Sequence, residues 1–337
     1  MKPLEKHHVL TWVLIPVSLL LFVFISICVG RYPISVSQVI AVLFSPLFDV
    51  SIDSTVKGIV GFVRLPRTLL GLLVGGSLSM AGTAFQGLFR NPLVSSGMLG
   101  VSAGSGFGAA LAIVLFGRSP VIYPFSFLFG ALAVICSYLV GRIYKSGSNI
   151  TLVLGGVIVG SLFSAMVSFL KYIADPYDQL PAIVFWLMGS LASAGYREIF
   201  IAGIAMLAGC GGLFAIRYKI NVLAVGEKEA RTMGVNVKLV RIFVISCATL
   251  ASAGAVCVSG VIGWVGLVVP HMGRMLVGSD NRLLMPFSFA LGGCFLITVD
   301  TISRAISGSE LPLGILTAFV GAPFFIYLLN KTKAKEW

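Results

Sequence analysis

Long stretches with almost no charged residues recur along the whole sequence, and they restrict the fold more than any other feature. The first of them, Val9–Gly30, contains no Asp, Glu, Lys or Arg. A helix needs about 20 consecutive apolar residues to cross the hydrocarbon core of a membrane. Of the 337 residues, 58% are hydrophobic and 11% are charged, whereas a soluble domain carries about 25% charged residues. The sequence therefore predicts an all-α, polytopic membrane protein with one transmembrane domain over residues 1–337.

About ten transmembrane helices are predicted, because a chain of this length accommodates roughly eight to eleven spans with their loops. Val9–Gly30 is too long for the apolar part of a cleavable signal peptide and lacks a small-residue cleavage site, so we interpret it as the first span. Two amphipathic pieces are predicted to be interfacial helices, Val36–Phe44 within Tyr32–Val63, and Ala182–Leu191. The predicted spans are Val9–Gly30, Leu69–Leu88, Met98–Phe116, Phe125–Val140, Ile150–Leu170, Ile199–Ile216, Val240–Ser259, Trp264–Leu276, Leu284–Ile302 and Leu313–Leu329.

Lysine and arginine are distributed unevenly between the two ends of the predicted spans. With a cytoplasmic N-terminus, about two thirds of the 24 Lys and Arg residues fall on the cytoplasmic side. Cytoplasmic loops of membrane proteins carry an excess of these residues. The bias predicts that both termini are cytoplasmic and that the number of spans is even. The same bias explains the net charge of +12, so this charge does not indicate a nucleic-acid partner.

The longest polar interruption between apolar segments is Ile220–Arg241. Four charged residues lie within the five positions of Glu227–Arg231, between Gly226 and Gly234. Since glycine favours helix ends, a short charged helix between two breaks is predicted. Such a helix, on the cytoplasmic side, suits contact with a soluble partner. An ordinary solvated loop is the alternative that these residues alone leave open.

The sequence carries no recognisable catalytic or metal-binding pattern. The phosphate-binding motif G-x-x-x-x-G-K-[ST] is missing, so no ATP site of that type is predicted in this chain. The six cysteines have no C-x-x-C spacing, which indicates small buried side chains and not metal ligands or disulfides. Few ionisable residues fall deep in the spans, whereas ion-coupled carriers keep several there as a relay. An ion-coupled secondary transporter and a multi-span structural protein are therefore the less favoured alternatives to a pathway driven by a partner.

Several short motifs follow one another across nearly the whole chain. They are Arg64-Leu-Pro-Arg67, Gly82-Thr-Ala-Phe-Gln86, Arg90-Asn-Pro-Leu93, Gly97-Met-Leu-Gly100, Gly226–Val235, Gly263–His271, Gly278–Arg282, Glu310–Gly314 and Gly321-Ala-Pro323. In this order they resemble the FecCD family, the permease subunits of ABC importers for iron-siderophores, haem and vitamin B12. Within the family, the overall likeness favours the molybdate/tungstate importer permease, although this sequence carries no anion-binding motif.

This resemblance implies the type II ABC importer permease fold and a non-catalytic transport subunit in the bacterial inner membrane. Members of the family form homodimers with the pathway between the two subunits. Two cytoplasmic ABC ATPase subunits supply the work, so ATP and Mg²⁺ belong to those partners and no cofactor is expected in this chain. A periplasmic substrate-binding protein delivers the cargo, here a metal chelate or metal oxyanion such as an iron-siderophore, haem, cobalamin, molybdate or tungstate.

The resemblance also implies roles for residues at matching positions. Within residues 220–241, the ATPase coupling helix is expected at Glu227, Lys228, Glu229, Ala230, Arg231, Thr232, Met233 and Gly234. Acidic residues of the binding protein are expected to meet Arg64, Arg67 and Arg304. The cytoplasmic gate is expected at Asn91, Leu93, Ser146, Gly147, Ser148 and Asn149, and the pathway lining at Gly155, Gly156, Gly160 and Ser164. The alternatives are snorkelling at the membrane interface for the arginines and a plain tight turn for residues 146–149.

Overall fold

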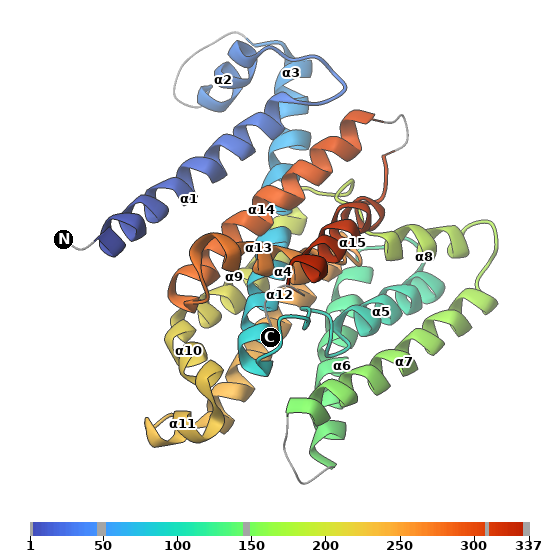
Figure 1. Ribbon diagram of the computed structural model, residues 1–337. Coiled ribbons are helices and arrows are strands. Elements are labelled where there is room, and N and C mark those ends of the chain that lie inside the picture. Colours follow the sequence, from blue (N-terminus) through green and yellow to red (C-terminus); the bar gives the residue numbers. More distant parts are fainter. Residues whose placement is uncertain (1–2, 46–51, 144–148, 307–309, 333–337) are drawn as a thin grey trace.

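The computed structural model describes residues 3–45, 52–143, 149–306 and 310–332, with side chains from Ile15 to Tyr327 apart from that of Asn149. Within these ranges the chain forms helices and no strand. Figure 1 shows them as one bundle around α4. The elements are α1 (Pro3–Cys28), α2 (Val36–Phe44), α3 (Ser54–Gly58), η1 (Ile59–Arg64), α4 (Leu65–Phe89), α5 (Val101–Phe116), α6 (Ile122–Ile143), α7 (Asn149–Ile173), α8 (Gln179–Met188), α9 (Tyr196–Ala215), α10 (Arg217–Val225), α11 (Glu227–Thr232), α12 (Val237–Ser259), α13 (Val265–Val277), α14 (Asn281–Ile306) and α15 (Leu313–Thr332).

Every predicted span coincides with a helix, which confirms the all-α membrane architecture. Four shorter apolar helices, in α1, α5, α13 and α15, correspond to four of the predicted spans. Both predicted amphipathic pieces are also helical, as α2 and α8. Among the described residues, six helices are long and apolar enough to cross a membrane: Ser54–Phe89, Ile122–Ile143, Ile150–Ile173, Tyr196–Ala215, Val237–Ser259 and Asn281–Ile306.

The second span is longer than predicted. We expected it to begin at Leu69, after the amphipathic stretch Tyr32–Val63, but α3, η1 and α4 form one continuous helix over Ser54–Phe89. The turn before Pro66 is a π-helix, in which the N–H of Leu65 donates to the carbonyl of Val60. A proline ring normally clashes with the carbonyl four residues before it, and the wider turn relieves that clash. Pro66 therefore marks a change of helix type and not a helix start.

Helix α4 lies at the centre of the bundle and packs against α9, α12, α13 and α14. Paired glycines make two of these crossings close. Gly75 meets Gly292 where α4 crosses α14, and Gly82 meets Gly266 where α4 crosses α13. A Cβ atom at any of the four would overlap a backbone carbonyl of the neighbouring helix. Small residues let helix backbones approach in lipid, so these glycines set the spacing of the central helices.

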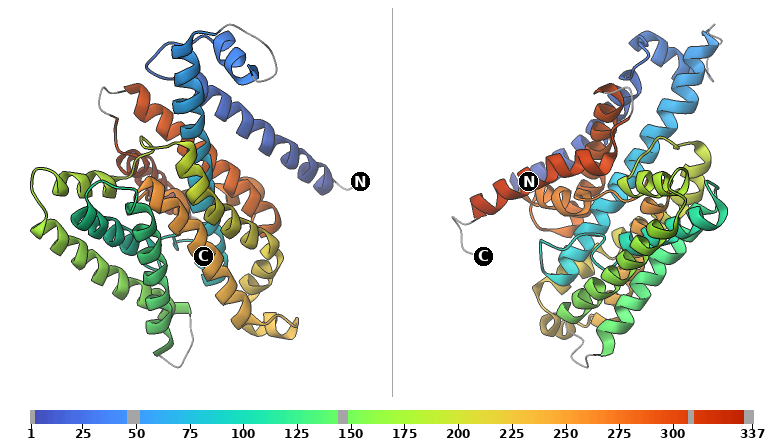
Figure 2. Two further views of the ribbon diagram at one scale, coloured as in Figure 1. Left: turned by 180° about the vertical axis from the view of Figure 1, so that it is seen from behind. Right: turned by 90° about the vertical axis from the view of Figure 1, so that its right-hand side faces the viewer.

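Helices α5, α6 and α7 form a second packed group beside this centre (Figures 1 and 2). Gly104 of α5 lies against the carbonyl of Phe129 in α6, and Gly155 of α7 lies against the carbonyl of Ser137 in α6. Helix α12 joins the two groups, because it packs against α4 and also against α6. The ends of the bundle differ, with α2 and α3 at one end and α10 and α11 at the other (Figure 1).

Candidate functional site

Helices α10 and α11 form a short projection at one end of the bundle (Figure 1). Gly226 separates the two helices, and a Cβ atom there would overlap the carboxylate of Glu229. Gly234 follows α11 with a φ of 76°, a conformation that favours glycine. The N–H of Val235 then donates to the carbonyl of Ala230 at 3.0 Å. The predicted short charged helix between two glycine breaks is therefore present.

Side-chain hydrogen bonds tie α10 to the start of α14. Asn221 Nδ2 donates to Asp280 Oδ1 at 2.6 Å, and Asn221 Oδ1 accepts from the N–H and the Nδ2 of Asn281, both at 2.8 Å. Asp280 also pairs with Arg282 at 2.7 Å. The hydrogen bond from Arg282 is the main cause that lowers the pKa of Asp280 to about 2. Since α10 also packs against α4, the projection is attached to two central helices.

An ion pair ties α11 to α12. Glu227, the first residue of α11, pairs with Arg241 of α12 and, at 3.9 Å, with Arg231. The side chain of Arg241 is 14% exposed and that of Glu227 is 35% exposed, so water screens this pair only partly. Ala230 is buried. Among the residues expected to couple, Glu227 and Ala230 thus face the bundle and brace the projection.

The outer face of the projection is exposed and mixed in character. Three apolar side chains are largely exposed on or beside it, Val225 at 64%, Met233 at 65% and Leu239 at 63%. Protein interfaces commonly combine an apolar centre with a charged rim. This face has that composition. The residues on it that were expected to couple are Lys228, Glu229, Arg231, Thr232, Met233 and Gly234.

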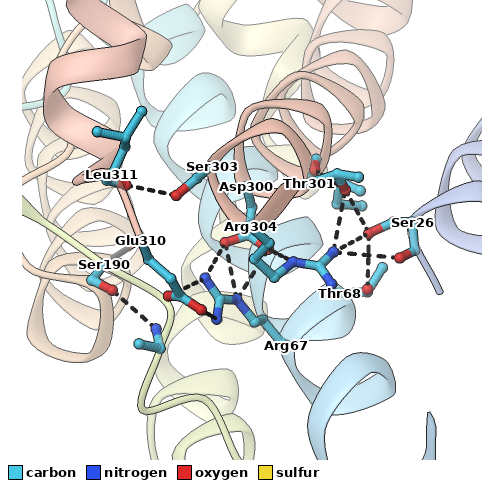
Figure 3. A network of polar contacts seen from close by, with 12 residues as sticks. Ser26, Arg67, Thr68, Ser190, Asp300, Thr301, Ser303, Arg304, Glu310 and Leu311 are labelled. Atoms are coloured by element: carbon cyan, nitrogen blue, oxygen red, sulfur yellow. Dashed lines mark hydrogen bonds and ion pairs between the residues drawn. The ribbon is translucent and has the colours of Figure 1, made fainter. Parts of the chain in front are cut away.

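A buried cluster of charges joins α4, α14 and the segment before α15 (Figure 3). Arg67 Nη2 donates to Asp300 Oδ1 at 2.8 Å, and its Nη1 donates to Glu310 Oε1 at 2.8 Å. Arg304 donates to Asp300 Oδ2 at 3.0 Å and to Ser26 Oγ of α1 at 3.0 Å. Two positive and two negative groups therefore balance, which offsets the high cost of burying each charge alone.

The three arginines expected to meet a binding protein are buried. Arg64, Arg67 and Arg304 are 3%, 5% and 8% exposed. Arg64 donates to the carbonyls of Ile27 and Tyr32, at 2.9 and 2.5 Å, and the other two belong to the charge cluster. The three guanidinium groups are thus turned into the chain in this conformation, and their contact with a binding protein stays a prediction. The three side chains hold α1, α4 and α14 together, and they do not snorkel at an interface.

Asp300 and Glu310 were not foreseen as the partners of these arginines. A signal for one pair was present, because Asp300 and Arg304 lie four residues apart on a helix, the spacing of an intrahelical ion pair. The pairing of Arg67 with Asp300 spans 233 positions, and no local pattern reveals it. Glu310 lies between α14 and α15, 243 positions after Arg67. Its contact with Arg67 therefore also depends on tertiary structure.

The turn after α4 contains the part of the expected gate that the structure describes. Arg90 ends α4 in a left-handed conformation with a φ of 52°. Asn91 Oδ1 accepts a hydrogen bond from the N–H of Leu93 at 2.9 Å, and both residues are exposed. The remaining gate positions Ser146, Gly147 and Ser148 lie outside the described residues, and Asn149 is described only as the first residue of α7. The gate therefore stays a prediction.

A polar contact that the sequence did not indicate fixes this turn to α13. Gln86 of α4 is 3% exposed. Its Nε2 donates to the carbonyl of Val94 at 3.0 Å, and its Oε1 accepts from Arg274 of α13. A displacement of α13 would therefore reach the turn that carries Asn91 and Leu93.

Small residues of α7 and of the segment at the start of α5 line an open groove of about 500 Å³. Gly100 and Ser102 lie on the α5 side, and none of the lining residues is charged. Gly155 departs from the expectation that it lines a pathway, because it faces α6, where a Cβ would lie 2.5 Å from the carbonyl of Ser137. The expected pathway residues that do line this groove are Gly156, Gly160 and Ser164.

The chain resembles known transporters along nearly its whole length. Residues 18–331 match the FecCD transport family. The chain is 39% identical over 310 residues to the molybdate import system permease protein MolB of Haemophilus influenzae, with 92% of each chain covered. It is 36% identical over 300 residues to the hemin transport system permease protein HmuU of Yersinia pestis, covering 87% of this chain and 89% of that protein. A solved structure described as an inward-facing conformation of a metal-chelate type ABC transporter has a TM-score of 0.84 and 38% identity, covering 94% of this chain and 97% of that one.

These similarities agree with the architecture. The six long apolar helices make the chain a multi-pass membrane protein, and the family match extends from α1 to α15. The named relatives are permease proteins for molybdate, iron chelatin and hemin. The chain is therefore an ABC transporter permease of the metal-chelate, molybdate, vitamin B12 and haem type, and it belongs to the FecCD transport family.

Proposed function

We propose that this chain is the permease subunit of a binding-protein-dependent ABC importer that moves a metal chelate or metal oxyanion into the cytoplasm. The projection formed by α10 and α11 carries this assignment. Its outer face is exposed and mixed in character, while Asn221 and Glu227 attach its inner face to α14 and α12. An exposed element with so firm an internal attachment transmits the movement of a soluble partner to the membrane helices. The chain itself is non-catalytic in this scheme, and ATP with Mg²⁺ binds to the partner ATPase.

The working assembly is a homodimer with two cytoplasmic ATPase subunits and a periplasmic substrate-binding protein. An exposed apolar groove of about 670 Å³, lined by residues of α8, of the segment between α12 and α13, and of α15, supports contact with a second copy. Trp264, Ile315 and Phe319 contribute its larger side chains. The assembly lies in a bacterial inner membrane with both termini and the α10–α11 projection in the cytoplasm, as the distribution of Lys and Arg indicates.

Transport follows from two alternative packings of the same helices. The ATPase moves α11, and the attachments at Asn221 and Glu227 pass this movement to α14 and α12. Glycine contacts between α4, α13 and α14 allow close sliding without long interlocking side chains. Helix α13 then acts on the turn at Asn91 through Arg274 and Gln86. With Ser146–Asn149, this turn forms the cytoplasmic gate of the dimer.

The cargo is a metal chelate or a metal oxyanion. The groove beside α7 has no charged lining residue, which suits passage of cargo that another protein has already selected. Two relatives named above are permeases for molybdate and for hemin, so the binding protein sets the choice within this class.

An ion-coupled secondary transporter is the alternative. Asp300 and Glu310 are acids inside the bundle, as a proton relay requires. Both are paired with arginines, however, so neither is an unpaired acid of the kind that a relay along a pathway needs.

Reconstituted uptake distinguishes the two schemes. The permease is placed in liposomes with its ATPase, with the cognate binding protein outside, and uptake of labelled molybdate, ferric siderophore, haem and cobalamin is measured. We expect uptake of one of these cargoes that requires internal ATP and persists when ionophores collapse the ion gradients. Gradient-driven uptake by the permease alone would contradict the importer assignment. An affinity screen on the binding protein identifies which cargo to test first.

A further inference from the structure

A second groove lies between α6 and α12, apart from the coupling face and the groove beside α7. Its volume is about 380 Å³. Its lining is apolar except for three hydroxyl groups, and the hydroxyl of Thr249 already donates to the carbonyl of Ile245 at 2.7 Å. The lining residues are Ala131, Val134, Ile135, Tyr138, Ile242, Ile245, Ser246, Thr249 and Leu250.

Each wall of the groove ends in a basic residue. On α6 the stripe of lining residues leads through Tyr138 to Arg142, four positions later and on the same helix face. On α12 the stripe leads back through Ile242 to Lys238, again four positions away. Arg142 is in the last turn of α6 and Lys238 is in the first turn of α12. Because the two helices run in opposite directions, both basic residues lie at the end of the bundle that carries α11.

These two basic residues are exposed and have no acidic partner among the residues that the structure describes. The guanidinium carbon of Arg142 lies 6.0 Å from the centre of the Tyr138 ring, which holds it near the mouth of the groove. Glu227, the acid that attaches α11 to α12, is already paired with Arg241.

The surroundings of the groove are those of a membrane-facing surface. Ile135 is 55% exposed and Leu139 is 56% exposed on α6, while Ile242 and Leu250 are each 38% exposed on α12. In a multi-pass membrane protein, such exposed apolar side chains on spanning helices contact acyl chains. The groove is therefore open to the hydrocarbon along its length and to positive charge at one end.

We propose that this groove binds an anionic phospholipid, with an acyl chain between α6 and α12 and the phosphate group at Arg142 and Lys238. Basic residues at the mouth of a groove between membrane helices attract anionic headgroups. A neutral or zwitterionic lipid would fill the same apolar groove without satisfying the two charges. The proposed site is distinct from the transport pathway and does not require any particular cargo.

Native mass spectrometry of the detergent-purified permease tests this site directly. The protein is titrated with phosphatidylglycerol and, separately, with phosphatidylcholine of the same acyl chains. We expect the wild type to prefer phosphatidylglycerol, and the preference to fall as ionic strength rises. The double variant Arg142→Gln, Lys238→Gln should bind phosphatidylglycerol about 25-fold more weakly, since each basic residue near a membrane surface contributes roughly a factor of five.

A matched control removes the same two residue types from the opposite end of the bundle. The double variant Arg197→Gln, Lys57→Gln loses two exposed positive charges there and should bind phosphatidylglycerol like the wild type. A third variant, Ile135→Trp, fills the groove and should weaken binding of both lipids while the two charges remain. Equal phosphatidylglycerol binding by the wild type and the Arg142, Lys238 variant would overturn the proposal, as would an equal loss in the Arg197, Lys57 control.

Discussion

Arg67 donates three hydrogen bonds to the carboxylate of Asp300, which lies 233 positions later in the sequence; the shortest is 2.8 Å. Both side chains are buried, at 6% and 3% exposure. Asp300 also pairs with Arg304, and Arg67 also pairs with Glu310 (Figure 3). The cluster thus joins α4, α14 and the start of the segment that leads to α15, and its charges depend on one another.

Removal of Asp300 should destabilise the protein strongly. In Asp300→Ala two buried arginines keep only Glu310 as an acidic partner, and breaking a buried ion pair costs about 3–5 kcal/mol. Denaturant unfolding in detergent measures this loss. The matched control is Asp178→Ala, because Asp178 forms an exposed pair with Arg118 at 3.5 Å, worth less than about 1 kcal/mol. Equal effects of the two substitutions would show that the cluster does not support the fold.

The glycine crossing between α4 and α13 gives a second prediction. Gly82→Ala forces the two helices apart, because the new Cβ would overlap the backbone of Gly266. A loss of about 1–3 kcal/mol is expected from such overpacking. Gly211→Ala on α9 meets no atom within 4 Å, and it should be neutral or stabilising by up to about 1 kcal/mol. Thermal unfolding of both variants checks this, and a stable Gly82→Ala protein would contradict the close crossing.

The fold was largely predictable from the sequence because apolar length is a direct signal in a membrane protein. Ten apolar stretches became helices, and Val36–Phe44 was found with its observed bounds. The second span was predicted to begin at Leu69, whereas its helix already begins at Ser54. A π-helical turn accommodates Pro66 within that helix, and the sequence offers no local sign of such a turn.

The candidate site was predictable where a local pattern carries it. The short helix of Glu227–Thr232 follows from its charges and flanking glycines. The burial and pairing of Arg67 could not be predicted from the sequence, because its partner Asp300 lies 233 positions later. The sequence also did not show that Glu227 faces inward while other charged residues of α11 face outward. That distinction depends on the ion pair between Glu227 and Arg241 of α12.

Asp280, in the connection between α13 and α14, should make the stability of the fold depend on pH. The hydrogen bond from Arg282 is the main cause that lowers its pKa from 3.8 to about 2. A carboxylate whose pKa is lower in the folded state contributes stability above its ordinary pKa, and this contribution is lost as the pH falls from about 4 to about 2. Asp280→Asn should therefore lose less stability than the wild type over that range. Glu229→Gln, which removes an exposed carboxylate of the projection, is the control. Parallel stability curves for wild type and Asp280→Asn would contradict the assignment.

The proposed gate predicts crosslinking across the dimer. Single cysteines at Ser146 or Ser148, in a background without the six native cysteines, should form a disulfide between the two copies in one nucleotide state and much less in the other. Transport should stop on oxidation and return on reduction. Intact transport without a crosslink in any state would place the gate elsewhere and leave residues 146–149 as a plain turn.

The central claim is that the projection couples the permease to its ATPase. Charged residues on its outer face can be replaced without disturbing its attachment to the bundle. Lys228, Glu229 and Arg231 are exposed, so replacing all three with alanine should leave stability within about 1 kcal/mol of the wild type. The attachments at Asn221 and Glu227 stay intact. The control triple Lys57→Ala, Arg118→Ala, Asp178→Ala removes matching exposed charges at the opposite end.

The most direct measurement is the affinity of the detergent-purified permease for its ATPase, followed by ATP-driven uptake in liposomes. For the Lys228, Glu229, Arg231 variant we expect the affinity to fall at least about tenfold, as for loss of central interface residues, and uptake to fall with it. The control triple should bind the ATPase like the wild type. Wild-type affinity and full uptake in the α11 variant would contradict the claim that this projection couples the permease to ATP hydrolysis.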